Sequence, residues 1–311
     1  MKKKVSIVIP TFNEIKNVPL LTPEIIKYIP NKYDYEIIFV DDDSPDNTFL
    51  EVMKLGKKNK KIKGVKMYKR AGLQPSFMAG FKVATGAAVI NMDADFQHPP
   101  KLIPKLIELW EKGHDLVEPI KAEDKHSSGV RLVLRNLGYK TWEHLTGGVL
   151  TQKVSEFRLM DREIVKYIAN SHESEIYVRG VAKLAAKSPA YVPYRVGKRK
   201  YGKSNFNLSR MLGIFLTGIV SFSTKPLRIA LIVGFVMLPI SVSLIVTDSL
   251  CFYFFGLRIF GNVSLIAYLA LLLLCFTIFY LGVLGEYLAV IFREIKKRPI
   301  YTIGQTVNIS E

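Results

Sequence analysis

Cysteine is scarce in this chain, which has only Cys251 and Cys275 among its 311 residues. A small fold stabilised by disulfides needs several pairs of cysteines, and a structural zinc site usually has four Cys or His ligands. The two cysteines therefore indicate neither a disulfide framework nor a thiolate metal site.

Acidic residues are also few relative to basic ones. The chain has 27 Asp and Glu against 44 Lys and Arg, which gives a formal net charge of +17. Such an excess points to an anionic partner: nucleic acid, a membrane surface or a phosphorylated substrate. The length allows one large domain or two modest ones, with a sizeable core in either case.

Charge is missing altogether from two long segments near the C-terminus. No charged residue occurs from Ile229 to Thr247 or from Ile259 to Gly285. Each run is long enough to cross about 30 Å of hydrocarbon as a helix. We predict two membrane spans, at 229–247 and 264–286; Gly234 and Pro239 make the first signal weaker. A buried hairpin in a soluble core is the alternative.

The charges around these runs predict an orientation. Basic residues precede the first run and follow the second, whereas only Asp248 and Arg258 lie between them. By the positive-inside rule both flanks are cytoplasmic and the short loop is outside. The apolar part of the N-terminal "MKKKVSIVIP" is too short for a secretory signal and is typical of a first strand. The basic flanking residues are Lys225, Arg228, Arg293, Lys296, Lys297 and Arg298.

The first 120 residues alternate short apolar runs with helical patterns. This alternation predicts an α/β fold with a mostly parallel sheet and helices on both faces. A further short strand and helix are expected in "SEFRLMDREIVKYIA", and a basic loop in "YVPYRVGKRKYGKSNFNL". The expected strands are 5–10, 35–40, 62–68, 86–92 and 115–120, and the expected helices are near 17–29, 46–56, 73–85 and 100–112.

Polar clusters follow three of these strands, at "PTFNE" (10–14), "DDDSPDNT" (41–48) and "DADFQHPP" (93–100). In open α/β sheets, ligands bind outside the carboxyl ends of the strands. Each cluster alone could be a turn or a helix cap, as Asp46 or Thr48 could be. Together they favour a site. Asp93 and Asp95 can approach one Mg²⁺ whose other ligands are water and phosphate oxygens; His98 could be a ligand or could orient the loop.

The ordered motifs "SIVIPTFNE", "VDDDSPDNT", "AGFKVATGAAVINMDADFQHPP" and "FRLMDRE", followed by two apolar runs, resemble one family. They are similar to the family 2 glycosyltransferases that load polyprenyl phosphates: bacterial undecaprenyl-phosphate glucosyltransferases and dolichol-phosphate mannose synthases. The resemblance implies a GT-A fold, a nucleotide-sugar donor, Mg²⁺ or Mn²⁺, and inversion at the anomeric carbon. It favours UDP-glucose as donor, with mannose or an N-acetylhexosamine as alternatives, and a role in modifying cell-envelope glycans.

The resemblance also assigns roles to residues. Pro10, Thr11 and Glu14 belong to the nucleotide pocket, Asp42 faces the base, and Asp41 supports it. Asp93 and Asp95 form the metal–diphosphate pair, with Asp95 the more direct ligand, and Gln97 borders the sugar. Arg158 lies near the donor and acceptor phosphates, and Arg199, Gly202 and Ser204 match a juxtamembrane R-x-x-G-x-S loop.

Three positions depart from the family pattern. Glu156 stands where an aspartate, often proposed as a base, usually precedes F-R-L. Asn205-Phe206 replaces the usual Lys-Tyr, so that a phosphate contact could move to Lys200 or Lys203. "YKRAGLQPSF" lacks an Asn often found beside its Arg. A phosphate monoester, with a second pKa near 6, needs little deprotonation at neutral pH. Glu156 is therefore expected to orient an Arg or lie near the metal rather than to remove a proton.

The expected organisation is a cytosolic catalytic domain (1–206), an interfacial helix (207–224), two transmembrane helices (225–292) and a cytosolic tail (293–311). Partners are the donor, the polyprenyl phosphate and the bilayer of the plasma membrane; a second copy and a flippase for the product stay open. The basic loop with Arg195, Lys198, Arg199, Lys200 and Lys203 could attract anionic lipids or capture the lipid-linked phosphate.

Other classes of function have less support in the sequence. A processive polysaccharide synthase would carry a Q-x-x-R-W-type motif, which is absent. A non-catalytic scaffold would not need the Asp93–Asp95 pair. Nucleic-acid binding is not expected, because the basic residues do not line an aromatic-studded groove.

Overall fold

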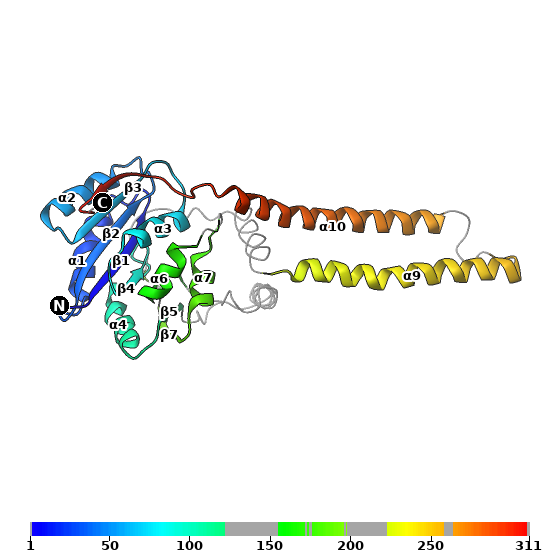
Figure 1. Ribbon diagram of the computed structural model, residues 1–311, viewed down its shortest axis with the longest axis horizontal. Helices are drawn as coiled ribbons and strands as arrows, with labels where there is room; N and C mark the ends of the chain where they lie inside the picture. Colours follow the sequence, from blue (N-terminus) through cyan, green and yellow to red (C-terminus); the bar gives the residue numbers. More distant parts are fainter. Residues whose placement is uncertain are drawn as a thin grey trace. The chain divides into compact units, whose positions relative to one another are not determined.

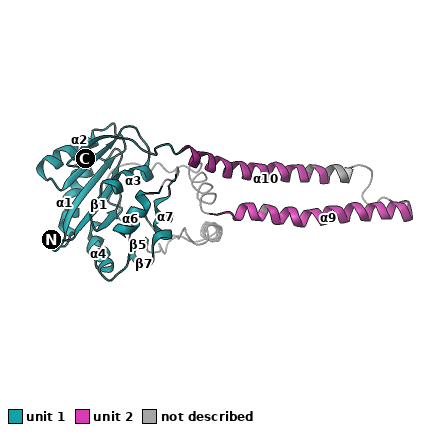
Figure 2. Ribbon diagram, in the orientation of Figure 1, with its two compact units in different colours: residues 1–143, 148–207, 297–311 teal, residues 144–147, 208–296 magenta. Residues whose placement is uncertain are grey.

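The computed structural model describes residues 2–121, 155–171, 173, 176–195, 197, 223–257 and 264–309. They divide into two compact units (Figure 2). The first holds a β-sheet, its helices and the C-terminal segment, and the second holds two long helices. The expected interfacial helix (207–224) falls almost wholly outside the described residues, and so do Lys198, Arg199, Lys200, Gly202, Lys203 and Ser204.

The first unit is built on one mixed sheet. Its described strands run in the order β7-β5-β6-β4-β1-β2-β3-β8. The centre is parallel, with β4, β1, β2 and β3 side by side, and β5 and β7 pair in parallel as well. Strand β6 lies antiparallel between β4 and β5, and β8 lies antiparallel against β3. The strands are β1 (Lys4–Thr11), β2 (Asp34–Asp41), β3 (Ile62–Met67), β4 (Ala88–Asn91), β5 (Leu116–Lys121), β6 (Arg158–Asp161), β7 (Pro189–Tyr194) and β8 (Ile303–Val307).

Helices cover both faces of the sheet (Figure 1). One face packs against α1 (Val18–Tyr28), α2 (Thr48–Lys58) and α4 (Ile103–Glu111), which follows the short 3₁₀ helix η1 (Pro100–Leu102). The other face packs against α3 (Leu73–Val83), α6 (Arg162–Ala169) and α7 (Val178–Ala185). Because β1 and β2 are covered on both faces, each has a continuous apolar run, at residues 7–10 and 37–40, as central parallel strands usually have. The predicted α/β class is confirmed.

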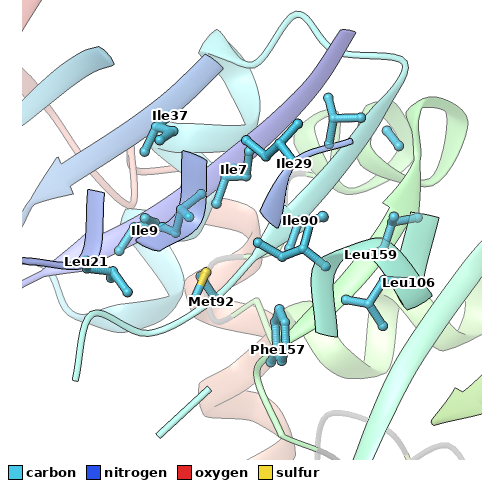
Figure 3. Packing of buried hydrophobic residues seen from close by; sticks show 14 of the residues in the cluster. Ile7, Ile9, Leu21, Ile29, Ile37, Ile90, Met92, Leu106, Phe157 and Leu159 are labelled. Carbon is cyan, nitrogen blue, oxygen red and sulfur yellow. The ribbon is translucent and has the colours of Figure 1, made fainter. Parts of the chain in front are cut away.

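Figure 3 shows part of the core on the first of these faces. Ile7 and Ile9 of β1 lie beside Ile37 of β2 and Ile90 of β4, and Leu21 and Leu106 pack on them from the helices. Phe157, which directly precedes β6, is fully buried in the same cluster. This cluster therefore holds the strands β1, β2 and β4 and the segment before β6 in place near the carboxyl ends of the parallel strands.

The C-terminal part of the first unit differs from the expected pattern. Residues from Tyr191 were expected to form a basic loop, but Tyr191–Tyr194 complete strand β7, paired with β5. The tail contributes β8, which closes the edge at β3. Both strands are short, and pairing with a distant strand, rather than their own pattern, holds them in place.

The second unit consists of α9 (Lys225–Phe255) and α10 (Ser264–Lys296), which run side by side in opposite directions (Figure 1). Both helices extend beyond the expected spans. The Tyr287 hydroxyl donates a hydrogen bond to the Ser223 carbonyl at 2.6 Å. Large apolar side chains lie exposed along α9, including Phe235 (79%) and Tyr253 (80%). Both helices are long and apolar enough to cross a membrane, and their candidate windows are not buried by protein.

A buried carboxylate stabilises the sheet at the end opposite to the carboxyl ends of the strands. Glu36 of β2 is 1% exposed and accepts hydrogen bonds from the Ser6 hydroxyl and the Thr85 backbone N–H. The Lys63 ammonium lies 2.6 Å from the same carboxylate. Burial would raise the pKa of Glu36, but the bonds from Lys63, Ser6 and Thr85 outweigh it and leave the pKa below its ordinary value.

We expect Glu36→Gln to lower the unfolding temperature at pH 7 and to flatten its pH dependence in acid. Since the folded-state pKa is depressed, this stabilisation is present above the ordinary glutamate pKa of about 4.3 and is lost as pH falls through the lower folded value. Thermal unfolding of both proteins in detergent between pH 7 and pH 3 tests this. The difference in unfolding temperature between the wild type and Glu36→Gln should become smaller as the pH falls. A difference that stays constant with pH would contradict this prediction.

Candidate active site

Three predicted clusters meet at one edge of the sheet. Because β4, β1 and β2 are neighbours and parallel, their carboxyl ends bring residues 93–98, 10–14 and 41–48 together. Arg158 begins the antiparallel β6 opposite Asn91, so its segment starts at the same edge. The described structure thus brings together Pro10, Thr11, Glu14, Asp41, Asp42, Asp93, Asp95, Gln97, Glu156 and Arg158.

The loops after β1 and β2 are bonded to each other. The backbone N–H of Asn13 donates to the Ser44 hydroxyl, and that of Glu14 donates to the Thr48 hydroxyl, both at 3.0 Å. Asp41 is fully buried and accepts bonds from the backbone N–H and the hydroxyl of Ser44. Burial raises the pKa of Asp41, while the Ser44 bonds act in the opposite direction. Asp41 thus supports the loop after β2 from within, and its predicted support of Asp42 at the base stays a prediction.

Asp42 holds a third loop in place. Its carboxylate accepts the backbone N–H groups of Ala71 (2.6 Å) and Gly72 (2.9 Å), just before α3. Arg70 in this loop stacks on the ring of Phe12, with its guanidinium carbon 3.8 Å from the ring centroid. The sequence assigned no role to Phe12, and it drew attention to Arg70 only because the Asn often found beside it is absent. The predicted contact of Asp42 with a base stays a prediction; the observed partners of this carboxylate are the two backbone N–H groups and the Arg70 guanidinium, whose Nε lies 3.9 Å from Asp42 Oδ2.

The D-x-D loop is a tight turn that separates its two carboxylates by environment. The Asp93 side chain is 32% exposed, whereas Asp95 as a residue is 6% exposed. Asp95 accepts the backbone N–H of Gln97 at 3.0 Å, and Phe96 between them has a positive φ of 66°. The turn therefore buries the Asp95 side chain under the loop backbone and leaves the Asp93 side chain partly exposed to solvent.

His98 orients this loop. Its Nδ1 accepts the backbone N–H of Asp93 at 3.0 Å, and its ring stacks on Phe157 with centroids 5.3 Å apart. Burial lowers the pKa of His98 to about 4, so the ring is neutral at pH 7 and its proton is on Nε2. Of the two roles left open by the sequence, the geometry favours orientation, since Nδ1 is already engaged.

The donor chemistry of this loop fits a divalent cation bound to a diphosphate. Among the described residues, no group of three or more His, Cys, Asp or Glu side chains is arranged to hold a metal. Asp93 and Asp95 offer two carboxylates, which is the number that Mg²⁺ typically takes from protein when phosphate and water complete its shell. The residues present therefore suit a metal shared with a substrate.

Glu156 lies just before β6 and Arg158 begins it, and their side chains are in contact. Arg158 is 0% exposed, and its Nη2 lies 2.8 Å from the Ser155 carbonyl and 3.4 Å from Glu156 Oε2. The Asn91 amide donates a hydrogen bond to the Glu156 carbonyl. A direct phosphate contact of Arg158 stays a prediction, and its observed contacts hold residues 155–156 in place.

Two residues that the sequence did not single out pack on the D-x-D loop. The N–H of Gly197 donates to the Gln97 carbonyl at 3.0 Å, and a Cβ at Gly197 would lie 2.4 Å from the Phe96 carbonyl oxygen. Only glycine fits so close to that backbone. Tyr194, at the end of β7, meets the His98 ring edge-on. A glycine within a basic stretch was the only available signal.

Comparisons with known proteins agree with this arrangement. Residues 6–168 match the model of glycosyl transferase family 2. The putative glycosyltransferase CsbB of Bacillus subtilis is 32% identical over 302 residues, covering 97% of this chain and 91% of the relative. The SfII prophage-derived bactoprenol glucosyl transferase of Shigella flexneri is 31% identical over 307 residues, covering 97% and 98%.

A solved structure supports the fold. Glucosyl-3-phosphoglycerate synthase of Mycobacterium tuberculosis, solved with Mn²⁺, UDP-glucose and phosphoglyceric acid, superposes with a TM-score of 0.51 at 18% identity. The match covers 71% of this chain and 78% of that one. On the family match and the full-length relatives, this chain belongs to glycosyl transferase family 2 and is a glycosyltransferase.

Proposed function

We propose that this enzyme transfers glucose from UDP-glucose to undecaprenyl or another polyprenyl phosphate at the cytoplasmic face of the membrane, with inversion at the anomeric carbon. One observation carries the proposal. The similarity to a bactoprenol glucosyl transferase extends over 97% of the chain, and so includes the two apolar helices as well as the catalytic unit.

The two helices suit a lipid acceptor. From Arg228 to Asp248, α9 rises about 30 Å, which is the thickness of the hydrocarbon core. Arg293 and Lys296 lie in the last turn of α10. With basic residues at this end of both helices, the positive-inside rule favours cytoplasmic termini and a cytoplasmic catalytic unit. The interfacial helix and the basic loop, as well as a second copy and a flippase, stay predictions.

Asp93 and Asp95 would hold Mg²⁺ or Mn²⁺ on the donor diphosphate. When bound, such a cation stabilises the negative charge that develops on the leaving nucleoside diphosphate. The backbone around the pair prepares the site in advance: His98 fixes the N–H of Asp93, and the N–H of Gln97 fixes Asp95. Preorganised charge of this kind contributes more to catalysis than flexible charge does.

The acceptor phosphate would attack the anomeric carbon directly. Its oxygen forms the new bond as the bond to the nucleoside diphosphate breaks, which inverts the configuration. A phosphate monoester is largely dianionic at pH 7, so the attack needs little help from a base. Glu156 and Arg158 would then orient the phosphates, in keeping with their mutual contact at 3.4 Å.

The test is transfer in isolated membranes that contain the protein. Undecaprenyl phosphate is offered with a panel of UDP- and GDP-sugars, with and without EDTA. We expect a lipid-linked sugar from UDP-glucose, its loss in EDTA and its return with Mg²⁺ or Mn²⁺. A product from GDP-mannose or a UDP-N-acetylhexosamine instead would correct the donor, and no lipid-linked product from any donor would refute the function.

A further inference from the structure

A buried carboxylate lies beside Arg158 on the neighbouring strand. Leu116 pairs with Met160 and Val117 with Leu159, and the next step of this antiparallel register places Glu118 of β5 opposite Arg158 of β6. Glu118 is 1% exposed, and its Oε1 lies 3.8 Å from Arg158 Nε. The two charges therefore face each other inside the protein.

This pair is expensive for the fold. Taking two ions out of water carries a large desolvation cost, and two apolar side chains at such positions are often as stable or more so. Neither carboxylate oxygen of Glu118 has a hydrogen-bond partner among the described residues, and the same holds for Nε and Nη1 of Arg158. A purely structural pair would be expected to satisfy these groups.

The pair lies next to the edge of the sheet that carries the candidate active site, because Arg158 begins β6 at this edge and Glu118 faces it. Arg158 also pairs in register with Asn91 of β4, so a polar row of Asn91, Arg158 and Glu118 crosses three adjacent strands. Its members contact the segment before β6: Asn91 bonds the Glu156 carbonyl, and Arg158 contacts the Ser155 carbonyl and the Glu156 carboxylate. The row thus connects the strand before the D-x-D loop with Glu156.

We propose that Glu118 is a positioning residue for sugar transfer: its carboxylate holds the buried Arg158 guanidinium, and through it keeps Glu156 oriented at the donor site. Glu118 approaches Arg158 Nε at 3.8 Å and Glu156 approaches Nη2 at 3.4 Å, so removal of either changes the balance of charge on the guanidinium. Burial raises the pKa of Glu118, and the cations Arg158, Arg179 and Lys183 oppose this. Loss of the Arg158 charge would therefore raise the pKa of Glu118 further.

The inference rests on the proposed function for its activity readout, and a double-mutant cycle tests it. Glu118→Gln keeps the shape and removes the charge. In detergent, we expect its kcat to fall about 10- to 100-fold, the scale of a misplaced catalytic group, with the donor KM within about twofold. Glu118→Asp should recover part of the loss. Because Glu118 acts through Arg158, Glu118→Gln should cause no further loss of kcat in an Arg158→Gln background.

Glu36→Gln is the matched control, because it also neutralises a buried carboxylate paired with a cation, Lys63. It lies at the other end of the sheet and should lower the unfolding temperature with kcat within about twofold. If Glu118→Gln behaves like this control, or if its loss of kcat multiplies with that of Arg158→Gln, the proposal is wrong.

The thermal readout separates this proposal from the proposed function. If the wild type makes no lipid-linked sugar, the proposed function fails. The unfolding temperatures of the wild type, Glu118→Gln, Arg158→Gln and the double variant still show whether Glu118 and Arg158 act as a pair. Coupled shifts, with the double variant more stable than the sum of the single losses predicts, support the Glu118–Arg158 unit; additive shifts overturn it.

Discussion

Asp95→Asn should lower kcat/KM for sugar transfer by about 10²–10³-fold, the usual scale for removing one preorganised charge-stabilising group. The substitution keeps the size of the side chain and an oxygen that can accept the Gln97 N–H, so the turn itself should survive. What is lost is the negative charge that would hold the cation on the leaving diphosphate. Initial rates with UDP-glucose and undecaprenyl phosphate across a range of Mg²⁺ concentrations measure the effect.

Glu156→Gln provides the comparison that decides the mechanism. Loss of a true general base costs about 10²–10⁴-fold. If the Glu156 carboxylate only orients Arg158, Glu156→Gln should lower the transfer activity less than Asp95→Asn does. Asp34→Asn is a suitable control, because its salt bridge with Lys61 lies at the exposed opposite end of the sheet. A larger loss for Glu156→Gln than for Asp95→Asn would refute the account in which the acceptor phosphate needs no base.

Removal of residues 299–311 should destabilise the catalytic unit by about 3–5 kcal/mol, comparable to deleting a large buried side chain. The truncation exposes the edge of β3, which β8 covers, and removes Ile300, Tyr301, Ile303 and Ile309 from the core around α3. An uncovered edge also invites pairing with other chains. Thermal unfolding and size-exclusion chromatography in detergent should show a lower unfolding temperature and aggregation.

Asn308→Gly is the graded variant for the same prediction. Asn308 has a φ of 55°, which glycine adopts without strain, and its amide donates to the Gly56 and Ile62 carbonyls at 2.8 Å each. The substitution therefore removes these two hydrogen bonds, and the exposed one that Oδ1 accepts from Lys60 at 3.3 Å, and leaves the strand, at a cost of about 1–3 kcal/mol. A truncated protein as stable as the full chain would show that β8 is dispensable.

Much of the N-terminal architecture could be predicted because it depends on local pattern. The first five strands and the four helices between them begin and end within about two residues of the expected bounds, except that α4 begins three residues late, after the 3₁₀ helix η1. The meeting of residues 10–14, 41–48 and 93–98 followed from the rule that parallel strands end at one edge. The two apolar helices were evident from the absence of charge, although both are longer than expected.

The rest required long-range pairing. Strand β8 is separated by most of the chain from β3, and nothing in "IGQTV" predicts that partner. Strand β7 lies in a stretch whose basic residues suggested a loop. Glu118 stands in an apolar strand, "DLVEPI", where a single buried acid was the only signal, and its meaning depends on Arg158 in an antiparallel neighbour.

By itself, the sequence determined the α/β class, the two apolar helices and the positions of Asp93 and Asp95, because hydrophobic periodicity and charge act within a few residues. The tertiary structure alone decided that β6 inserts antiparallel beside β4, that the tail closes the β3 edge, and that Glu118 faces Arg158. These depend on which distant segments bury each other's surface, and no local pattern of residues carries that information.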